Sequence, residues 1–359
     1  MEKYKKTNRI GEGAHGVVYR AALLPQYNHI VTQHHSQYKP SNNNNMNDMN
    51  NIKNSIIDVN DYHNDNEEEK KQADNDPAIY VAIKKIRVKN IRDGLSMEAI
   101  REIKLLHELY NQYIMPVYDI FMHEHNVNIV MEYMSYDLES LIRATDTIIL
   151  THSHIKTYLY MILQSIQCIH SQYIMHRDIK PGNYLISTSG ELKLADFGLA
   201  KLYGTPYKSH SPQACTLWYR APELLYGSKS YTGQCDMWSV GCILGELMWR
   251  KPLFIAERDK ELSQLQVIFA VLGTPTQTQW PNMQYLQNYV EFDTIQGKPL
   301  KSLFPSATDD CIDLLSQMLQ YNPSTRITAQ QALQHRYFKS APEMTPINQL
   351  PKLDTTKKK

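Results

Sequence analysis

Two stretches near the start of the chain, residues 10–22 and 79–86, are predicted to be strands. Apolar positions alternate around the glycines of the first stretch, and the second is a short, mostly apolar run. Residues 128–134 form a further apolar strand pattern, and from residue 153 onward the pattern is mostly helical. Helical spacing between these regions is shown by Ile100, Ile103, Leu106 and Leu109. A chain of 359 residues is long enough for about two domains or lobes, with strands early and helices late.

A polar segment from Pro25 to about Pro77 interrupts the early strands. It contains four consecutive asparagines at 42–45 and three glutamates at 67–69. Few large apolar residues are available there to offset the entropy of ordering the chain. We therefore predict a disordered, Asn-rich insertion at residues 25–77, either a solvated spacer or a binding segment.

Composition excludes several classes of protein. The net charge is +1, which gives no global attraction to nucleic acid or to a membrane surface. The five cysteines form no Cys-x-x-Cys pair, which argues against a zinc site and for a reducing compartment. The first residues lack the apolar core of a signal peptide, and no apolar run approaches ~18 residues, so no membrane span is expected.

Candidate chemistry gathers in residues 176–183, which read His-Arg-Asp-Ile-Lys-Pro-Gly-Asn, and in the Asp-Phe-Gly of residues 196–198. Phosphoryl transfer needs such a set. Asp178 is predicted to orient the attacking hydroxyl and accept its proton, and Lys180 to neutralise charge on the transferring phosphoryl group. Asn183 and Asp196 are predicted to hold Mg²⁺. Together the two motifs form the catalytic signature of protein kinases.

Residues 11–16 read Gly-Glu-Gly-Ala-His-Gly, a pattern that dinucleotide-binding folds share. Because the chain continues as a strand rather than a helix, the pattern favours a glycine hairpin folded over phosphates. A plain hairpin turn is the alternative. Ala82 and Lys84 share a face of the next strand. Glu102, on the following helix, is predicted to form an ion pair with Lys84, the alternative being a solvated helix charge.

The apolar strand at 128–134 ends in a connector that is predicted to bind the nucleotide base. Backbone groups of Glu132 and Met134 are placed to bind an adenine edge, with Met131 guarding the pocket behind. Asp137 is expected to reach the ribose. Farther along the chain, an ion pair of Asp236 with an arginine, or of Glu223 with Arg326, is expected to tie the second lobe together.

The chain resembles the eukaryotic protein kinases from Tyr4 to about Phe338, apart from the insertion. Similarity to the cyclin-dependent kinases lies in residues 98–102 (EAIRE), 218–223 (WYRAPE) and 272–275 (LGTP). Within that family the chain is most similar to the cyclin H-dependent activating kinases associated with transcription factor TFIIH. This similarity lies in residues 93–95, 137–139, 150–156, 196–206, 279–283 and 289–290. Cell-cycle-related, splicing-linked and transcription-linked branches share residues 216–220 or 226–227 and are the alternative.

The resemblance implies an α+β, bilobal protein kinase fold at residues 4–338, with a tail at 339–359. The small, mainly β N-lobe with one key helix is expected at about 4–131, and the larger, mainly α C-lobe at about 135–338. The implied activity transfers the ATP γ-phosphoryl group, with Mg²⁺, to Ser or Thr before Pro. The expected ATP-binding residues are Ile10, Gly11, Glu12, Gly13, Ala14, His15, Gly16, Val17, Val18, Ala82, Lys84, Met131, Glu132, Met134, Asp137 and Leu185.

The resemblance also implies partners and control. Expected partners are a cyclin H-like cyclin, a RING-finger assembly subunit and the TFIIH core, with no direct contact to nucleic acid or membrane and a location in the nucleus, with the cytoplasm as a second compartment. Expected substrates are activation loops of other cyclin-dependent kinases and the C-terminal repeats of RNA polymerase II. Ser211 stands where these kinases carry an activating phosphothreonine. A phosphate there is expected to bridge Arg101, Arg177 and Lys201.

The chain departs from the family pattern at several positions. Ala14 and His15 replace a Thr-Tyr pair that inhibitory kinases modify, so that control should be absent. Gly182 and Tyr184 replace a larger polar residue and a leucine beside Asn183, which leaves the rigidity of the catalytic loop open. Ala214, Cys215 and Leu217 differ from the usual residues beside the pocket that receives the substrate residue after the phosphorylated Ser or Thr. A strict requirement for proline at that substrate position is therefore not expected to follow from the family resemblance alone.

A catalytically dead scaffold that holds a cyclin is the alternative from another functional class. Such relatives lose one of the residues that bind nucleotide or metal or accept the proton. This chain retains all four of them, Lys84, Asp178, Asn183 and Asp196, which favours an active enzyme.

Overall fold

The computed structural model describes residues 3–13, 16–32, 79–86, 97–124, 126–203, 217–257 and 260–354. The chain separates into two compact units. The first comprises Met1–Lys89 and Pro116–Tyr133, and the second comprises Asn90–Met115 and Met134–Lys359. No helix in the described ranges has both the length and the apolar character needed to cross a bilayer.

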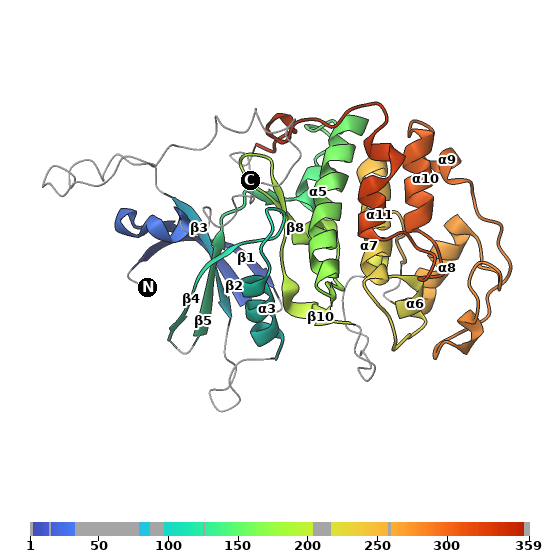
Figure 1. Ribbon diagram of the computed structural model, residues 1–359, viewed down its shortest axis with the longest axis horizontal. Helices are drawn as coiled ribbons and strands as arrows, with labels where there is room; N and C mark the ends of the chain where they lie inside the picture. Colours follow the sequence, from blue (N-terminus) through green and yellow to red (C-terminus); the bar gives the residue numbers. More distant parts are fainter. Residues whose placement is uncertain are drawn as a thin grey trace, which may run out of the picture. The chain divides into compact units, whose positions relative to one another are not determined.

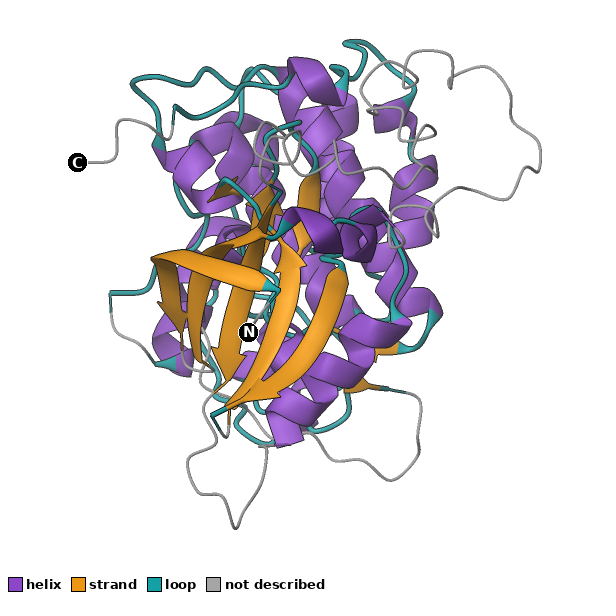
Figure 2. Cartoon of the chain, turned by 90° about the vertical axis from the view of Figure 1, so that its left-hand side faces the viewer, coloured by secondary structure: helices purple, strands orange, loops and turns teal. Residues whose placement is uncertain are grey.

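The first unit is built on one antiparallel sheet, drawn in Figures 1 and 2. Its strands follow the order β1-β2-β3-β5-β4. Their bounds are β1 (Tyr4–Gly13), β2 (Gly16–Leu23), β3 (Tyr80–Ile86), β4 (Val117–His123) and β5 (Asn126–Glu132). The two stretches predicted as strands thus form neighbouring strands, although more than fifty residues separate them in sequence.

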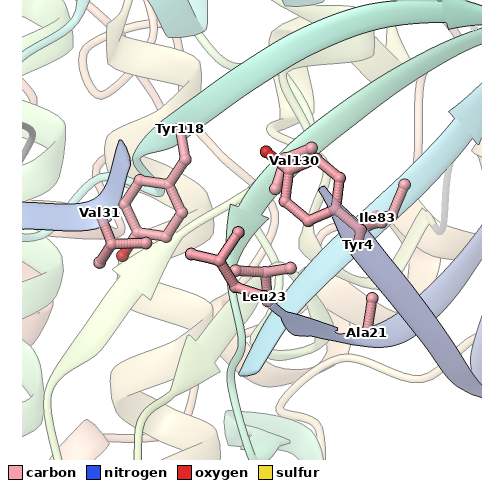
Figure 3. Close-up of a cluster of buried hydrophobic side chains, with 8 residues drawn as sticks. Tyr4, Ala21, Leu23, Val31, Ile83, Tyr118 and Val130 are labelled. Carbon is pink, nitrogen blue, oxygen red and sulfur yellow. The ribbon is translucent and has the colours of Figure 1, made fainter. Parts of the chain in front are cut away.

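One face of this sheet carries a buried apolar cluster (Figure 3). Its members are Tyr4, Ala21, Leu23, Val31, Val81, Ile83, Tyr118 and Val130. Side chains alternate between the faces of a strand, so Ala82 and Lys84 lie on the opposite face from Val81 and Ile83. The sheet therefore has one face packed as a core and one face that carries Ala82 and Lys84, two of the residues predicted to bind nucleotide.

The segment after β2 corrects the predicted start of the insertion. A 3-10 helix at Pro25–Tyr27 and a helical turn at 29–32 follow β2. Val31 is buried in the apolar cluster, and Tyr27 and Ile30 pack against it. These apolar residues cover sheet surface that would otherwise face water, which offsets the cost of ordering the segment. The rest of the predicted insertion, residues 33–77, lies outside the described residues.

The second unit is mainly helical. Its helices are α3 (Met97–Glu108), α4 (Leu138–Arg143), α5 (His152–Ser171), α6 (Pro222–Leu225), α7 (Gln234–Trp249), α8 (Glu261–Leu272), α9 (Leu300–Leu303), α10 (Asp309–Met318) and α11 (Ala329–Gln334). Helix α5 packs on α7 and α11, and α7 also packs on α10. Residues 235–247 of α7 are buried on every side, as expected for a helix at the centre of a bundle.

Two small sheets join the helices and position the catalytic loop. One contains β6 (Tyr136–Asp137), β8 (Tyr184–Ile186) and β9 (Leu192–Leu194), in that order. The other pairs β7 (Ile174–Met175) with β10 (Lys201–Leu202). The catalytic loop leaves β7 and enters β8, so both of its ends are held by backbone pairing.

The predicted ion pair between Glu223 and Arg326 is present. Arg326 Nη1 and Nη2 donate to Glu223 Oε1 and Oε2 at 2.8 and 3.0 Å, and both side chains are buried. This bidentate pair joins the start of α6 to a residue 103 positions later. Among the described residues, Asp236 is hydrogen-bonded to backbone amides and a histidine rather than to an arginine side chain, as set out below.

Residues 339–354, predicted as a tail, pack along the second unit. Lys156 of α5 is buried and donates through Nζ to the carbonyl oxygens of Ser340 and Pro342, at 2.7 Å each. Thr157 Oγ1 donates to the carbonyl oxygen of Thr345 at 2.8 Å. The buried ammonium is thus hydrogen-bonded, as burial of a charge requires.

Candidate active site

Asp178, Lys180 and Asn183 converge on one carboxylate. Lys180 Nζ donates to Asp178 Oδ2 at 2.8 Å, and Asn183 Nδ2 donates to the same oxygen at 2.9 Å. Asn183 Nδ2 also donates to the Asp178 carbonyl at 2.7 Å. Within the described part of the chain, Asp178 Oδ1 makes no hydrogen bond, so the predicted role of proton acceptor falls to this oxygen.

Asn183 and Asp196 are brought together by the backbone. The Ala195 amide donates to the Asn183 carbonyl at 2.9 Å, which places the residue before Asp196 beside the metal-binding candidate. Asp196 itself has φ of 62°, a left-handed conformation that is uncommon for non-glycine residues. Such backbone strain persists where the surrounding structure holds it, and it clusters at functional sites.

The donor chemistry of this pair fits Mg²⁺. Both amide protons of Asn183 are directed at Asp178, so its Oδ1 points away from that carboxylate as a free hard-oxygen ligand. Asp196 adds a carboxylate, and Mg²⁺ bound to nucleotide takes one or two protein oxygens besides phosphate and water. Asn183 and Asp196 are therefore suited to hold a magnesium ion that would accompany ATP.

His176 links the catalytic loop to the Asp-Phe-Gly turn. Its Nε2 lies 3.0 Å from the Ala195 carbonyl, and its Nδ1 lies 3.3 Å from the Asp178 amide. Nε2 must then carry the proton, because a carbonyl accepts and an amide donates. The His176 ring also packs edge-on against Phe197, with ring centroids 4.9 Å apart.

Asp236 of α7 anchors the catalytic loop, a role that the sequence alone did not reveal. It accepts the backbone amides of His176 and Arg177 at 2.8 Å each, and its Oδ2 lies 3.0 Å from His170 Nε2. Burial by itself raises the pKa of Asp236, but hydrogen bonds and the nearby histidines outweigh it and hold the pKa below the usual range. The only signal in the sequence was a carboxylate that opens an otherwise apolar helix.

Arg177 is held in place on both sides. It has φ of 68°, and its Nε donates to the Leu199 carbonyl at 2.7 Å. Its Nη1 donates to the Tyr231 hydroxyl at 3.0 Å. Helix α3 packs against the 3-10 turn Phe197–Leu199, so the helix that carries Arg101 and Glu102 contacts the segment that Arg177 binds.

The two departures beside Asn183 have different surroundings. Tyr184 is fully buried, and its hydroxyl lies 3.3 Å from Ser165 Oγ on α5. A Cβ at Gly182 would meet Glu139 Oε2 at 3.0 Å, closer than ordinary contact. Tyr184 thus ties the loop to α5, and Gly182 avoids crowding Glu139 of α4.

On the first unit, Val18, Ala82, Lys84 and Met131 lie on one face of the sheet, whereas Val17 is buried on the opposite face. Val18 pairs with Lys84, and Ala82 pairs with Met131. Residues directly opposite one another on antiparallel strands share a face. Gly16 has φ of 152°, and a Cβ there would lie 2.2 Å from the Lys85 carbonyl oxygen, so the hairpin requires glycine at this position. Glu12 and Gly13 lie at the tip of β1, Ile10 and Gly11 precede them, and Val17 follows Gly16 on β2.

On the second unit, Asp137 and Leu185 pair across β6 and β8. Asp137 also caps α4, because its Oδ1 accepts the Ser140 amide at 2.6 Å. Its other carboxylate oxygen is left for the predicted contact with ribose. Met134, two residues before β6, is buried.

Several predicted residues lie outside the described part of the structure. They are Ala14 and His15 of the glycine hairpin, the side chains of Arg101 and Glu102, and the loop at 204–216 with Ser211. The predicted ion pair of Lys84 with Glu102, and a phosphate bridging Arg101, Arg177 and Lys201, therefore stay predictions. Lys201 itself lies on β10 opposite Met175.

Residues 70–338 match the family model described as "Protein kinase domain". The chain therefore belongs to the protein kinase family, and the fold predicted from its motifs, with a β-sheet N-lobe and a helical C-lobe, is confirmed. Its relatives place it among the cyclin-dependent kinases of the activating type, which confirms the resemblance drawn from sequence.

Three relatives illustrate the similarity. "Cyclin-dependent kinase D-1" of Oryza sativa subsp. japonica is 47% identical over 272 residues, which cover 76% of this chain and 63% of the relative. The chain thus matches less than two thirds of the rice protein. "Cyclin-dependent kinase 7" of Dictyostelium discoideum is 48% identical over 275 residues, covering 76% of each chain. A chain in the "Structure of the CAK complex form Chaetomium thermophilum bound to ATP-gamma-S" is 31% identical, with a TM-score of 0.79, and the match covers 98% of this chain and 96% of that one.

Proposed function

We propose that the protein is a cyclin-dependent serine/threonine kinase that transfers the ATP γ-phosphoryl group to Ser or Thr followed by Pro. The observation that carries the proposal is the Asp178 carboxylate, whose Oδ2 is held by Lys180 and Asn183 while Oδ1 is left to accept a proton. A scaffold without activity has no need for this arrangement.

Each residue has a part in the transfer. Asp178 Oδ1 orients the substrate hydroxyl and takes its proton as the oxygen attacks the γ-phosphorus, and Lys180 stabilises the negative charge of the transferring group. Asn183 Oδ1 and Asp196 would hold Mg²⁺, which would neutralise negative charge on the phosphates of ATP. Lys84, paired with Glu102, binds the α- and β-phosphates, and the glycine hairpin covers them.

The comparisons support finer parts of the proposal. The similarity to a chain of a CAK complex supports a cyclin H-like partner, with a RING-finger assembly subunit and the TFIIH core as further partners. From the family resemblance we further propose, as substrates, activation loops of other cyclin-dependent kinases and the C-terminal repeats of RNA polymerase II, and a nuclear location. Ser211 is the proposed activating phosphosite, with Arg101, Arg177 and Lys201 as its ligands.

The test is phosphate transfer from Mg-ATP to a Ser-Pro peptide by the full chain bound to a cyclin H-type cyclin. The control is Asp178→Asn, which keeps the shape of the side chain but removes its basicity. Loss of the base should lower kcat by a factor of about 10²–10⁴ with little change in ATP affinity. Equal transfer by wild type and variant would refute the enzyme assignment. ATP binding without transfer would favour the cyclin-binding scaffold.

A further inference from the structure

Arg20 of β2 forms an unusual stack at one end of the first unit's sheet. Its guanidinium carbon lies 3.7 Å from the centroid of the Tyr80 ring and 5.1 Å from that of Tyr133. The two rings are 6.5 Å apart and tilted by 58°, so the cation contacts both of them. Arg20 Nε is buried and has no hydrogen-bond partner in the described ranges, which makes the rings its principal surroundings.

This stack lies on the face predicted to bind nucleotide. Arg20 pairs with Ala82 across β2 and β3, and Ala22 pairs with Tyr80. Residues opposite one another share a face, so Arg20 lies with Val18, Ala82 and Lys84, away from the apolar cluster. Tyr80 is the diagonal neighbour of Arg20 on that face, within reach of a long side chain.

Tyr133 links the stack to the connector that is predicted to bind adenine. It directly follows β5 (Asn126–Glu132) and stands in sequence between Glu132 and Met134, whose backbone groups are the proposed partners of the adenine edge. Arg20 therefore ties the end of β5 to β2 and β3, whose Ala82 side chain lies on the nucleotide face. A cation between two aromatic faces restrains a connector more firmly than either contact alone.

We propose that Arg20 is a positioning residue for the nucleotide base, acting through Tyr133 to hold the connector in the conformation that binds adenine. This inference rests on the proposed kinase function of the same site. Arg20 itself makes no contact with the phosphates in this proposal, so its influence is confined to the base and the ribose.

The experiment measures binding of Mg-ATP, adenosine and Mg-tripolyphosphate to the full chain by calorimetry. Arg20→Gln removes the charge and the planar cation, and it should weaken ATP and adenosine roughly three- to tenfold, the equivalent of one partly desolvated cation–π contact. Affinity for Mg-tripolyphosphate, which has no base, should stay unchanged. Arg20→Lys should recover part of the loss, because it restores the charge but not the planar group.

A matched control exists in the same sheet. Lys6 Nζ lies 4.5 Å from the centroid of the Tyr19 ring, and Lys6 and Tyr19 pair with Ala21 and Ile83 on the opposite face. Lys6→Gln should leave the affinities for ATP and adenosine within twofold of wild type. A double-mutant cycle of Arg20→Gln with Tyr133→Leu should be non-additive, because both changes break one contact.

The outcomes separate the two proposals. If wild type fails to bind Mg-ATP, the proposed kinase function fails. If wild type binds and a folded Arg20→Gln variant binds adenosine equally well, the positioning role is overturned while the kinase assignment stands. Equal weakening of tripolyphosphate and adenosine would also overturn it, since that result would mark general disruption of the sheet.

Discussion

Replacement of Asp236 by asparagine tests how the catalytic loop is held. The carboxylate accepts two backbone amides at 2.8 Å and lies 3.0 Å from His170 Nε2, all in a buried site. Asparagine is nearly isosteric, but it carries no charge and turns one acceptor into a donor that faces another N–H. A hydrogen bond to a charged group contributes about 1.5–3 kcal/mol, and a buried N–H left without an acceptor costs a further 1–3 kcal/mol.

These values predict that Asp236→Asn lowers the free energy of unfolding by about 3–5 kcal/mol, a large share of the 5–15 kcal/mol of a typical domain. The effect should also reach the chemistry. The backbone of Arg177 has a left-handed conformation, with φ of 68°. The hydrogen bond from its backbone amide to Asp236 stabilises this conformation. When that bond is lost, Asp178 loses its fixed position, and kcat should fall at least about tenfold with little change in nucleotide affinity.

Urea denaturation followed by circular dichroism measures the first effect, and steady-state kinetics on the cyclin-bound chain measure the second. The matched control is Asp313→Asn. Asp313 also accepts from a histidine, with His335 Nε2 at 3.1 Å, but it lies at the surface of α10. Its loss should cost no more than about 1 kcal/mol. If Asp236→Asn is as mild as the control, the anchoring role assigned to Asp236 is refuted.

Two further substitutions test buried charges in the second unit. Arg326→Met leaves the Glu223 carboxylate buried without its partner, so it should lower the free energy of unfolding, measured in urea, by about 3–5 kcal/mol. The double variant that also carries Glu223→Leu should recover much of that loss. A double variant as unstable as Arg326→Met alone would contradict this account. Burial raises the pKa of Glu246 to about 7, with its carboxylate 2.7 Å from the Tyr219 hydroxyl. Since the native state keeps this proton while the unfolded state releases it, stability should fall between about pH 4.5 and 7, by at most about 1.4 kcal/mol per pH unit. Glu246→Gln should lack that component of the slope, and identical pH profiles of variant and wild type would exclude the raised pKa.

Sequence alone was enough to predict which side chains come together within short segments. Asp178, Lys180 and Asn183 fall within six residues, so the chain itself keeps them close and their types already indicate phosphoryl transfer. The strand patterns of β2 and β3 were likewise visible in the sequence, because they depend only on neighbouring residues. The same local reasoning set the start of the insertion at Pro25, where apolar residues at 27, 30 and 31 look too sparse to fold by themselves.

Tertiary structure decided most contacts between distant residues, although the Glu223–Arg326 pair was already expected from the sequence. The segment at 25–32 is ordered because the sheet offers an apolar face for Val31. Asp236 anchors a loop 60 residues earlier, Lys156 binds carbonyls more than 180 residues later, and Arg20 meets Tyr133 only because β2, β3 and β5 are neighbours. Burial removes these groups from water, which is unfavourable for a charge or a polar atom unless packing places a suitable partner beside it. The type of a residue indicates that its side chain needs a partner when buried, and the packing of the chain determines which residue that partner is.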